Sequence, residues 1–148
     1  MGMFDALEIS ASGLTAERLR MDVVAENLAN AQTTRGADGQ PYRRKEVVLQ
    51  QRPAQGGFGA ALAGAMGARP GKPAGVEAAG VLQDQTPLKR VYDPGHPDAD
   101  ADGYVQMPNV DPVAEMVDLI TAQRAYEANV TAMQAAKQMF AKTLELLR

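Results

Sequence analysis

The chain has 148 residues, of which 45% are hydrophobic and only 5% aromatic, and its formal net charge is −3 at pH 7. This length fits one ordinary domain, and the scarcity of aromatic residues favours helix–helix packing over a thick globular core. The acidic balance, without a basic arm or stripe, argues against nucleic-acid binding, and the absence of cysteine excludes disulfides and thiolate chemistry.

The sequence contains no recognisable targeting or membrane-spanning segment. Residues 1–5 have no basic segment followed by an apolar run. No stretch approaches the roughly 18 consecutive apolar residues that a transmembrane helix needs. Gly2 does not begin a myristoylation motif, because Ala6 stands where Ser or Thr is required. We therefore expect no membrane span and no cleaved signal peptide.

Residues 4–30 are predicted to form the first long helix. Their apolar positions alternate at spacings of three and four, the pattern of a helix that faces one partner along its length. These positions are Phe4, Leu7, Ala11, Leu14, Arg18, Met21, Ala25 and Leu28, with Arg18 as the one polar exception. Gly13 lies within the pattern although glycine costs about 1 kcal/mol relative to alanine in a helix. A close helix contact or simple tolerance of the glycine is favoured over a functional hinge.

The middle of the chain is predicted to form a small sheet. Turn-forming residues fill 33–41, and a strand is predicted at 42–52. Two shorter strands are predicted at 81–83 and 88–91. About three strands are near the lower limit for a stable sheet.

The remaining middle segments are predicted to be loops. Residues 55–75 are rich in Ala, Gly and Pro and are expected to form a flexible loop. Residues 92–109 are rich in Pro and Asp and are expected to be an irregular connection. The short basic cluster Arg43, Arg44 and Lys45 is interpreted as a solvated strand end or as a contact with an acidic partner.

Residues 111–148 are predicted to form a second, longer helix, with Asp111 as N-cap and Pro112 at the first helical position. Such a helix would be about 54 Å long against roughly 40 Å for the first helix, so part of it stays uncovered within one chain. An uncovered apolar face is expected to bind other subunits. Its predicted seam consists of Leu119, Ala122, Tyr126, Asn129, Met133, Ala136, Phe140, Thr143 and Leu147.

Asn129 interrupts the apolar seam of the second helix. A buried Asn in a helix seam costs stability and fixes the register, because it requires a partner. We predict that Asn129 sets the register of a helix contact. The alternative is that it faces water where the helices diverge.

The predicted fold is mainly α. The long N- and C-terminal helices are expected to pair as an antiparallel coiled coil, with a small β-rich insert and a flexible loop between them. The predicted organisation is an N-terminal helix at 1–32, a β-rich and loop insert at 33–110, and a C-terminal helix at 111–148.

No catalytic group of residues is recognisable in the sequence. His96 is the only histidine, and it is interpreted as a turn residue because no Ser or Cys stands near it to be activated. Asp98, Asp100 and Asp102 copy the first half of a calcium loop. We disfavour a metal site there, because Asn109 occupies the position of the bidentate Glu and no helix precedes the loop. We expect no enzymatic activity and no cofactor.

Several segments resemble bacterial flagellar proteins. The sequences ENLANA at 26–31 and GQPYRR at 39–44 resemble the N-terminal motif of flagellar axial proteins. The sequences VYDPGHPDAD at 91–100 and RAYEANV at 124–130 resemble the proximal-rod family of flagellar basal-body rod protein C. Residues 55–75 carry no part of this resemblance.

The resemblance implies a structural subunit rather than an enzyme. Proteins of this family are exported from the cytoplasm by the flagellar type III apparatus without a cleaved signal peptide. They assemble through their terminal helices into the rod, the drive shaft that crosses the periplasm and transmits torque from motor to hook. The implied partners are other proximal-rod subunits, the membrane-ring adaptor protein, the distal rod protein and the export apparatus.

Nine residues on the two helices and at their ends are the predicted subunit contacts. They are Leu14, Met21, Asn27, Leu28, Asn30, Tyr126, Asn129, Met133 and Phe140. The residues alone also permit a free-standing coiled-coil adaptor protein. A calcium-binding regulator built on residues 98–103 is a third hypothesis.

Overall fold

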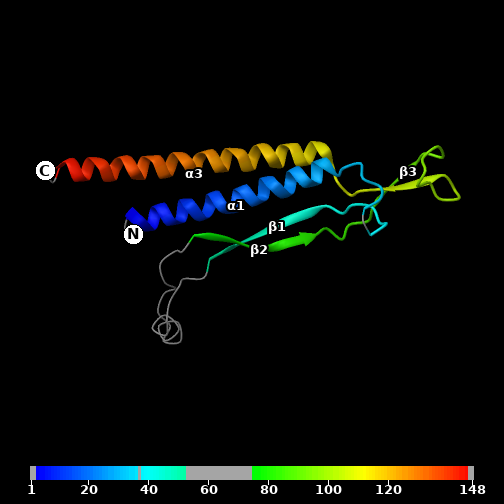
Figure 1. Cartoon of the computed structure of the whole chain (residues 1–148), viewed down its shortest axis with the longest axis horizontal. Helices are drawn as coiled ribbons and strands as arrows, with labels where there is room; N and C mark the ends of the chain where they lie inside the picture. The colour runs from blue at the N-terminus through cyan, green and yellow to red at the C-terminus, as the bar shows by residue number, and fades with distance from the viewer. Residues whose placement is uncertain (1–2, 37, 53–74, 147–148) are drawn as a thin grey trace, which may run out of the picture. The chain divides into compact units, whose positions relative to one another are not determined.

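The computed structural model describes residues 3–36, 38–52 and 75–146 (Figure 1). Its elements in chain order are α1 (Met3–Ala29), β1 (Lys45–Gln51), β2 (Val76–Gln83), β3 (Lys89–Tyr92), β4 (Tyr104–Met107) and α3 (Pro112–Leu146). The prediction of a mainly helical chain with β structure between two long helices is confirmed. The predicted flexible loop lies outside the described residues, apart from Gly75, and so does Leu147.

The chain is divided into two compact units, and each unit contains parts of both helices. Unit 1 comprises Met1–Arg18, Leu49–Ala79 and Arg124–Arg148, and unit 2 comprises Leu19–Val48 and Gly80–Gln123. Both helices and the first two strands therefore continue from one unit into the other.

In unit 1, the first part of α1 contacts the last part of α3. The rings of Phe4 and Phe140 meet edge to face with centroids 6.0 Å apart. Further along, Gly13 lies against Asn129, so the two contacts run in antiparallel order. A Cβ atom at Gly13 would lie 3.0 Å from Asn129 Nδ2. Of the interpretations of Gly13, the close helix contact is the one that the structure shows.

Unit 1 also joins α1 to the start of β2. Ser12 Oγ accepts a hydrogen bond from the Val76 amide at 3.0 Å and donates one to the Ile9 carbonyl at 2.7 Å. Gly75 precedes this strand with a φ of 91°, and a Cβ there would overlap Ser12 Oγ. Glycine is required here both by the backbone conformation and by the contact.

The seam predicted for α1 differs from the side that the structure buries. Its positions Phe4, Ala11, Arg18 and Ala25 are exposed, and the others are half-buried. The buried residues of α1 are Ser12, Ala16, Val23, Val24 and Asn27. The reason is that α1 packs against strand residues through polar side chains, which an apolar pattern cannot identify.

The second helix follows its prediction more closely. Asp111 Oδ1 accepts a hydrogen bond from the Val113 amide at 3.0 Å, which confirms the N-cap. Ala122 and Ala136 of the predicted seam are buried, whereas Thr143 is exposed. Within the described residues, neither helix is both long and apolar enough to cross a membrane.

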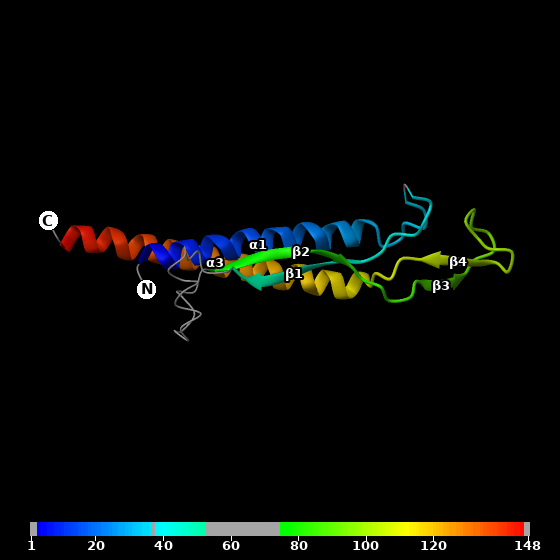
Figure 2. The ribbon, with the colours of Figure 1, turned by 90° about the horizontal axis from the view of Figure 1, so that it is seen from below.

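The four strands among the described residues form two separate two-stranded sheets. The Arg52 amide donates to the Gly75 carbonyl at one end of the β1–β2 pair, and the Asp84 amide donates to the Arg44 carbonyl at the other end, so these strands are antiparallel. β3 and β4 form an antiparallel ribbon (Figure 2). The prediction of one sheet with about three strands is wrong, because β4, predicted to be part of a connection, supplies β3 with its own partner.

A double-mutant cycle at Gly13 and Asn129 tests the helix contact. Gly13→Ala alone is expected to leave the free energy of unfolding unchanged or lower it, because the new methyl group pushes against Asn129. In an Asn129→Ala background the same change should raise it by about 1 kcal/mol, the difference in helix propensity between glycine and alanine. Urea unfolding followed by circular dichroism measures both values, and an identical effect in the two backgrounds would contradict the contact.

Candidate assembly interface

A buried amide in unit 2 joins α1 to the start of β1 and to α3. Asn27 is 0% exposed. Its Oδ1 accepts hydrogen bonds from the Lys45 amide and the Tyr42 hydroxyl, each at 2.9 Å. Its Nδ2 donates to the Lys45 carbonyl at 2.8 Å and to Glu115 Oε2 at 3.0 Å. All four hydrogen-bonding positions of this amide are therefore filled, as burial requires.

The carboxylate of Glu115 is the charged centre of the same cluster. Glu115 is 1% exposed, and its Oε1 accepts a hydrogen bond from Arg44 Nε at 2.5 Å. This hydrogen bond raises the pKa of Arg44 above its ordinary value. The Arg44 amide also donates to Asn109 Oδ1 at 2.8 Å, so the strand end is fixed by side chain and backbone together.

Tyr42 closes the cluster on the side of the loop before β1. Its hydroxyl group is partly buried and lies near two carboxylates. Burial, together with the charges of Glu26 and Glu115, raises the pKa of Tyr42 to about 12. The phenol therefore stays protonated and keeps donating to Asn27 across the neutral and mildly alkaline range.

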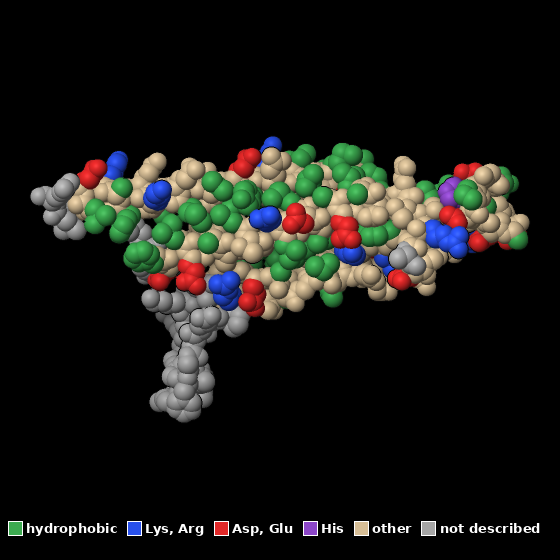
Figure 3. Space-filling model, in the orientation of Figure 1, with side chains coloured by type: hydrophobic (Ala, Val, Ile, Leu, Met, Phe, Trp, Pro, Cys, Tyr) green, Lys and Arg blue, Asp and Glu red, His purple; other side chains and the backbone are tan. Residues whose placement is uncertain are grey.

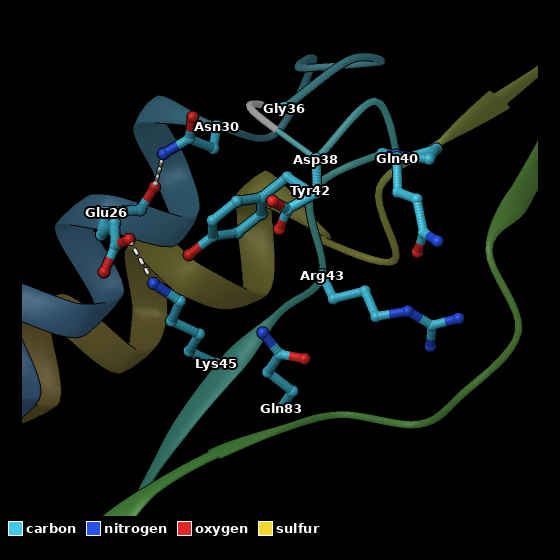
Figure 4. A pocket seen from close by; sticks show the side chains of 10 residues that line it. Glu26, Asn30, Gly36, Asp38, Gln40, Tyr42, Arg43, Lys45 and Gln83 are labelled. Atoms are coloured by element: carbon cyan, nitrogen blue, oxygen red, sulfur yellow. Dashed lines mark hydrogen bonds and ion pairs between the residues drawn. The ribbon is translucent and has the colours of Figure 1, made fainter.

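A polar hollow of about 440 Å³ lies next to Tyr42. Lys45 Nζ approaches Glu26 Oε1 at 2.5 Å, and Asn30 Nδ2 donates to the Glu26 carbonyl at 2.9 Å (Figure 4). Arg43 and Asp38 also line the hollow. Because its charges are of both signs and partly paired, the hollow favours no class of small ligand.

The basic cluster and the aspartates of the sequence mostly find partners inside unit 2. Arg44 and Lys45 contact acidic residues of the same chain. Asp98 Oδ2 accepts a hydrogen bond from the Thr34 hydroxyl at 2.9 Å. In the part of the chain that the structure describes, no three His, Asp or Glu side chains are grouped as metal ligands. His96 lies in a turn, as predicted, and its Nδ1 accepts from the Asp98 amide at 3.1 Å.

The first turns of α3 in unit 2 carry an exposed apolar stripe (Figure 3). It consists of Val113, Met116, Val117 and Ile120, of which Val113 is 68% and Ile120 51% exposed. At about 100° per residue, these four positions centre on the side of the helix opposite Glu115 and Ala122, which are buried. α3 thus has one face that packs within the chain and one apolar face that does not.

A second exposed apolar region lies at the end of α3 in unit 1. Residues 137–146 are all exposed, and they include Met139, Phe140, Leu144 and Leu146. Phe140 contacts Phe4, which is itself 72% exposed. Most of this helix end is therefore available to another chain.

The nine predicted contact residues have different environments. Leu14, Met21, Leu28, Asn30, Tyr126, Asn129 and Met133 are half-buried, Asn27 is buried and Phe140 is exposed. Asn27 and Asn129 each meet residues of their own chain. Their role in contacts between subunits stays a prediction.

Some residues of the site were missed by the sequence analysis. The stripe from Val113 to Ile120 was visible as an i, i+3, i+4, i+7 spacing outside the predicted seam. For Glu115 there was no such signal, since a carboxylate in the first turn of a helix is normally solvated.

Comparison with known proteins gives matches at both ends and over the full length. Residues 7–37 match the family model for flagella basal body rod protein, and residues 101–146 match that for the C-terminal part of flagellar basal body rod FlgEFG protein. The chain is 49% identical to flagellar basal-body rod protein FlgC of Bacillus subtilis over 99% of both chains. It is 47% identical to FlgC of Escherichia coli O157:H7 over 99% of this chain and 98% of the relative. With FlgC of Borreliella burgdorferi it shares 42% identity over 100% of this chain and 99% of the relative.

Replacing Glu115 tests whether the buried cluster stabilises the fold. Glu115→Ala leaves Arg44 without its closest carboxylate and Asn27 Nδ2 without one of its two acceptors, and it is expected to lower the free energy of unfolding by about 3 kcal/mol or more. Asp118→Ala is the matched control, because Asp118 is half-exposed and 3.4 Å from the same guanidinium. It is expected to cost less than about 1 kcal/mol. Similar losses in chemical unfolding of the two variants would contradict the role given to Glu115.

The raised pKa of Tyr42 predicts alkaline destabilisation. The unfolded chain loses the proton of this phenol near pH 10 and the folded chain only near pH 12, so stability is full below pH 10 and is lost as the pH rises between these values. Tyr42→Phe should remove this part of the pH dependence. Absorbance titration of tyrosinate is clean because the chain has four tyrosines and no tryptophan. A tyrosinate absorbance step that Tyr42→Phe removes and that lies near pH 10 would refute the prediction.

Proposed function

We propose a packing role for the terminal helices of this chain, which belongs to the FlgC family of flagellar basal-body rod proteins and is a structural subunit of the rod, not an enzyme. In this proposal α1 and α3 pair as an antiparallel coiled coil. The outer faces of α3 then bind neighbouring subunits of the proximal rod.

The observation that carries the proposal is the apolar stripe from Val113 to Ile120. Its four side chains stand on the face of α3 opposite the packed side. Contiguous exposed apolar surface of this kind marks an interaction site, since covering it removes apolar area from water at about 25 cal/mol per Å². Met116 adds a flexible side chain that fits surfaces of different shape.

The exposed end of α3 supports contact with more than one neighbour. Met139 and Leu144 lie in unit 1, whereas the stripe lies in unit 2. One helix therefore offers separate apolar surfaces near its two ends. A subunit that transmits torque needs such contacts along a stiff element, because each contact shares the load.

The ion pair of half-buried Arg44 and buried Glu115 supports the mechanical part of the proposal. It ties α3 to the start of β1 inside unit 2. The Asn27 amide adds α1 to the same point. A load applied to one helix is then carried by three elements.

We also propose the finer partners and location that the resemblance implies. The partners are other proximal-rod subunits, the membrane-ring adaptor protein, the distal rod protein and the export apparatus. The subunit leaves the cytoplasm without a cleaved signal peptide and becomes part of a rod that crosses the periplasm. Asn129, which meets Gly13 in the chain, sets the register of the helix pair. The relatives are rod proteins, which argues against a free-standing coiled-coil adaptor.

A charge placed in the stripe tests the proposal. Val117→Asp combined with Ile120→Asp is expected to abolish rod assembly and motility in a strain that lacks its own copy of the gene, because two carboxylates would have to be buried without partners. Ala114→Asp is the matched control, since Ala114 is exposed on the flank of the stripe. It should leave motility within about twofold of wild type, because a carboxylate on the flank can stay in water.

Circular dichroism of the purified variants shows whether the helices form equally well. A double variant that folds normally and still assembles rods would overturn the proposed role of the stripe. Loss of assembly in the Ala114→Asp control as well would do the same.

A further inference from the structure

The β3–β4 ribbon in unit 2 presents an ordered aromatic and basic face. The pairing register places Tyr92 opposite Tyr104 and Arg90 opposite Gln106, so these four side chains share one face. The two rings meet at 5.3 Å, and the Arg90 guanidinium lies 4.9 Å above the Tyr104 ring. Tyr92 is 64% exposed. Tyr and Arg held in this way are the residue types that dominate the binding energy of protein interfaces.

The opposite face of the ribbon is less exposed. Val105 is buried on that face, and its partner Val91 is 38% exposed. At the far end, Gly103 has a φ of 79°, and a Cβ there would lie 3.0 Å from the Tyr92 ring. The ring of Tyr92 is thus fixed against its own loop, and the face with Arg90 remains for a partner.

The two ends of the ribbon carry opposite charges. β3 begins with Lys89 and Arg90, both exposed. The loop of residues 93–103 at the other end carries Asp100 and Asp102, whose side chains are also exposed. Its shape is fixed, because the Asp100 amide donates to the Tyr104 carbonyl and the Asp100 carbonyl accepts from the Gly103 amide, each at 2.8 Å.

A hollow at the basic end of the β3–β4 ribbon can accommodate a loop of another chain. Its volume is about 370 Å³, and Lys89, Pro87 and Pro108 line it. Asp111 also lines the hollow, but its carboxylate is engaged as the N-cap of α3. The cation of Lys89 therefore stands at the edge of a concave and largely uncharged surface.

We propose that the basic end of this ribbon binds the acidic loop of a second copy of the chain, so that adjacent copies join head to tail. Charge complementarity selects this occupant: one copy carries both halves of the contact, at opposite ends. Binding through one half leaves the other half free for the next copy, which generates a ring or a helical array. The inference rests on the proposed function, since copies become neighbours in this way in an assembled rod.

Disulfide cross-linking tests the contact, because the chain has no cysteine of its own. Asp102→Cys and Gln106→Cys are introduced together into the full chain, which is expressed in a strain without its own copy. Basal bodies are then isolated and oxidised. The expected product is a ladder of dimers and higher oligomers, since each copy contributes one cysteine to each of two neighbours. Dimers alone would indicate a two-fold contact and would overturn the head-to-tail arrangement.

Charge reversal adds a matched series to the cross-linking. Two reversals are made separately in the double-cysteine chain: Lys89→Glu with Arg90→Glu at the basic end, and Asp100→Lys in the acidic loop. Each should lower the yield of cross-linked oligomers about fivefold, the effect expected for one to two exposed ion pairs. Combining the two reversals should restore at least half of the yield. A combined variant no better than either reversal alone would refute the charge pairing.

Near-ultraviolet circular dichroism of the tyrosines checks that the ribbon still forms in each of these variants. A reversal that keeps the tyrosine signal and leaves the yield unchanged would also refute the charge pairing.

The outcomes separate this inference from the proposed function. The double-cysteine variant can be absent from basal bodies although the wild-type chain enters them. Asp102→Cys and Gln106→Cys are then tested singly. If both single variants are also excluded from basal bodies, this supports a tight contact at these positions. If the wild-type chain itself is absent, the proposed function fails. If the variant is incorporated and cross-links only to other rod proteins, or to none, the second-copy contact is wrong while the rod function stands.

Discussion

The carboxylate of Glu115 is the group on which the packing of unit 2 depends. A buried charge is tolerated only when its attraction to a partner and its hydrogen bonds offset the loss of hydration. Arg44 supplies the charge and Asn27 the additional hydrogen bond. Each of these three residues comes from a different part of the chain, so the chain satisfies the charge only when α1, the start of β1 and α3 are all in place. An apolar contact of the same size would hold them together without demanding this one arrangement.

Unit 1 achieves a similar specificity with smaller groups. Gly13 allows Asn129 to approach α1, and Ser12 fixes the start of β2 through its hydroxyl. Neither contact buries a charge. The large apolar side chains of α3 therefore stay exposed. This arrangement suits a subunit of an assembly, because polar side chains specify the fold of one chain and apolar surfaces remain for its neighbours.

The helices were predictable because their signals are local. Asp111 and Pro112 mark a helix start by chemistry that acts within one turn, and Gly13 stands out in a helical pattern by its cost. The buried side of α1 was not predictable, because the sequence does not show that Ser12 and Asn27 form hydrogen bonds with the strands. β4 was missed for a related reason. Four residues are too few to show alternation, and the strand exists because β3 lies opposite it.

The candidate contact residues also include some that were predictable from the sequence and some that were not. The half-buried positions of α3, such as Tyr126 and Met133, follow from the heptad spacing alone. The spacing of the stripe was visible in the sequence, but its exposure was not, since only the burial of Glu115 shows which side of the helix is packed. The family followed from sequence motifs, and relatives with 40–49% identity over nearly the full length of this chain agree with it.

The hydrogen bonds of Asn27 also protect the edge of β1 in a chain whose function is assembly. An open strand edge is a template on which other chains add by backbone pairing, and this route leads to aggregates without defined order. The side-chain amide of Asn27 occupies both the N–H and the C=O of Lys45. At that point β1 offers no free edge, so association is steered away from indiscriminate strand addition and left to surfaces that recognise a particular neighbour.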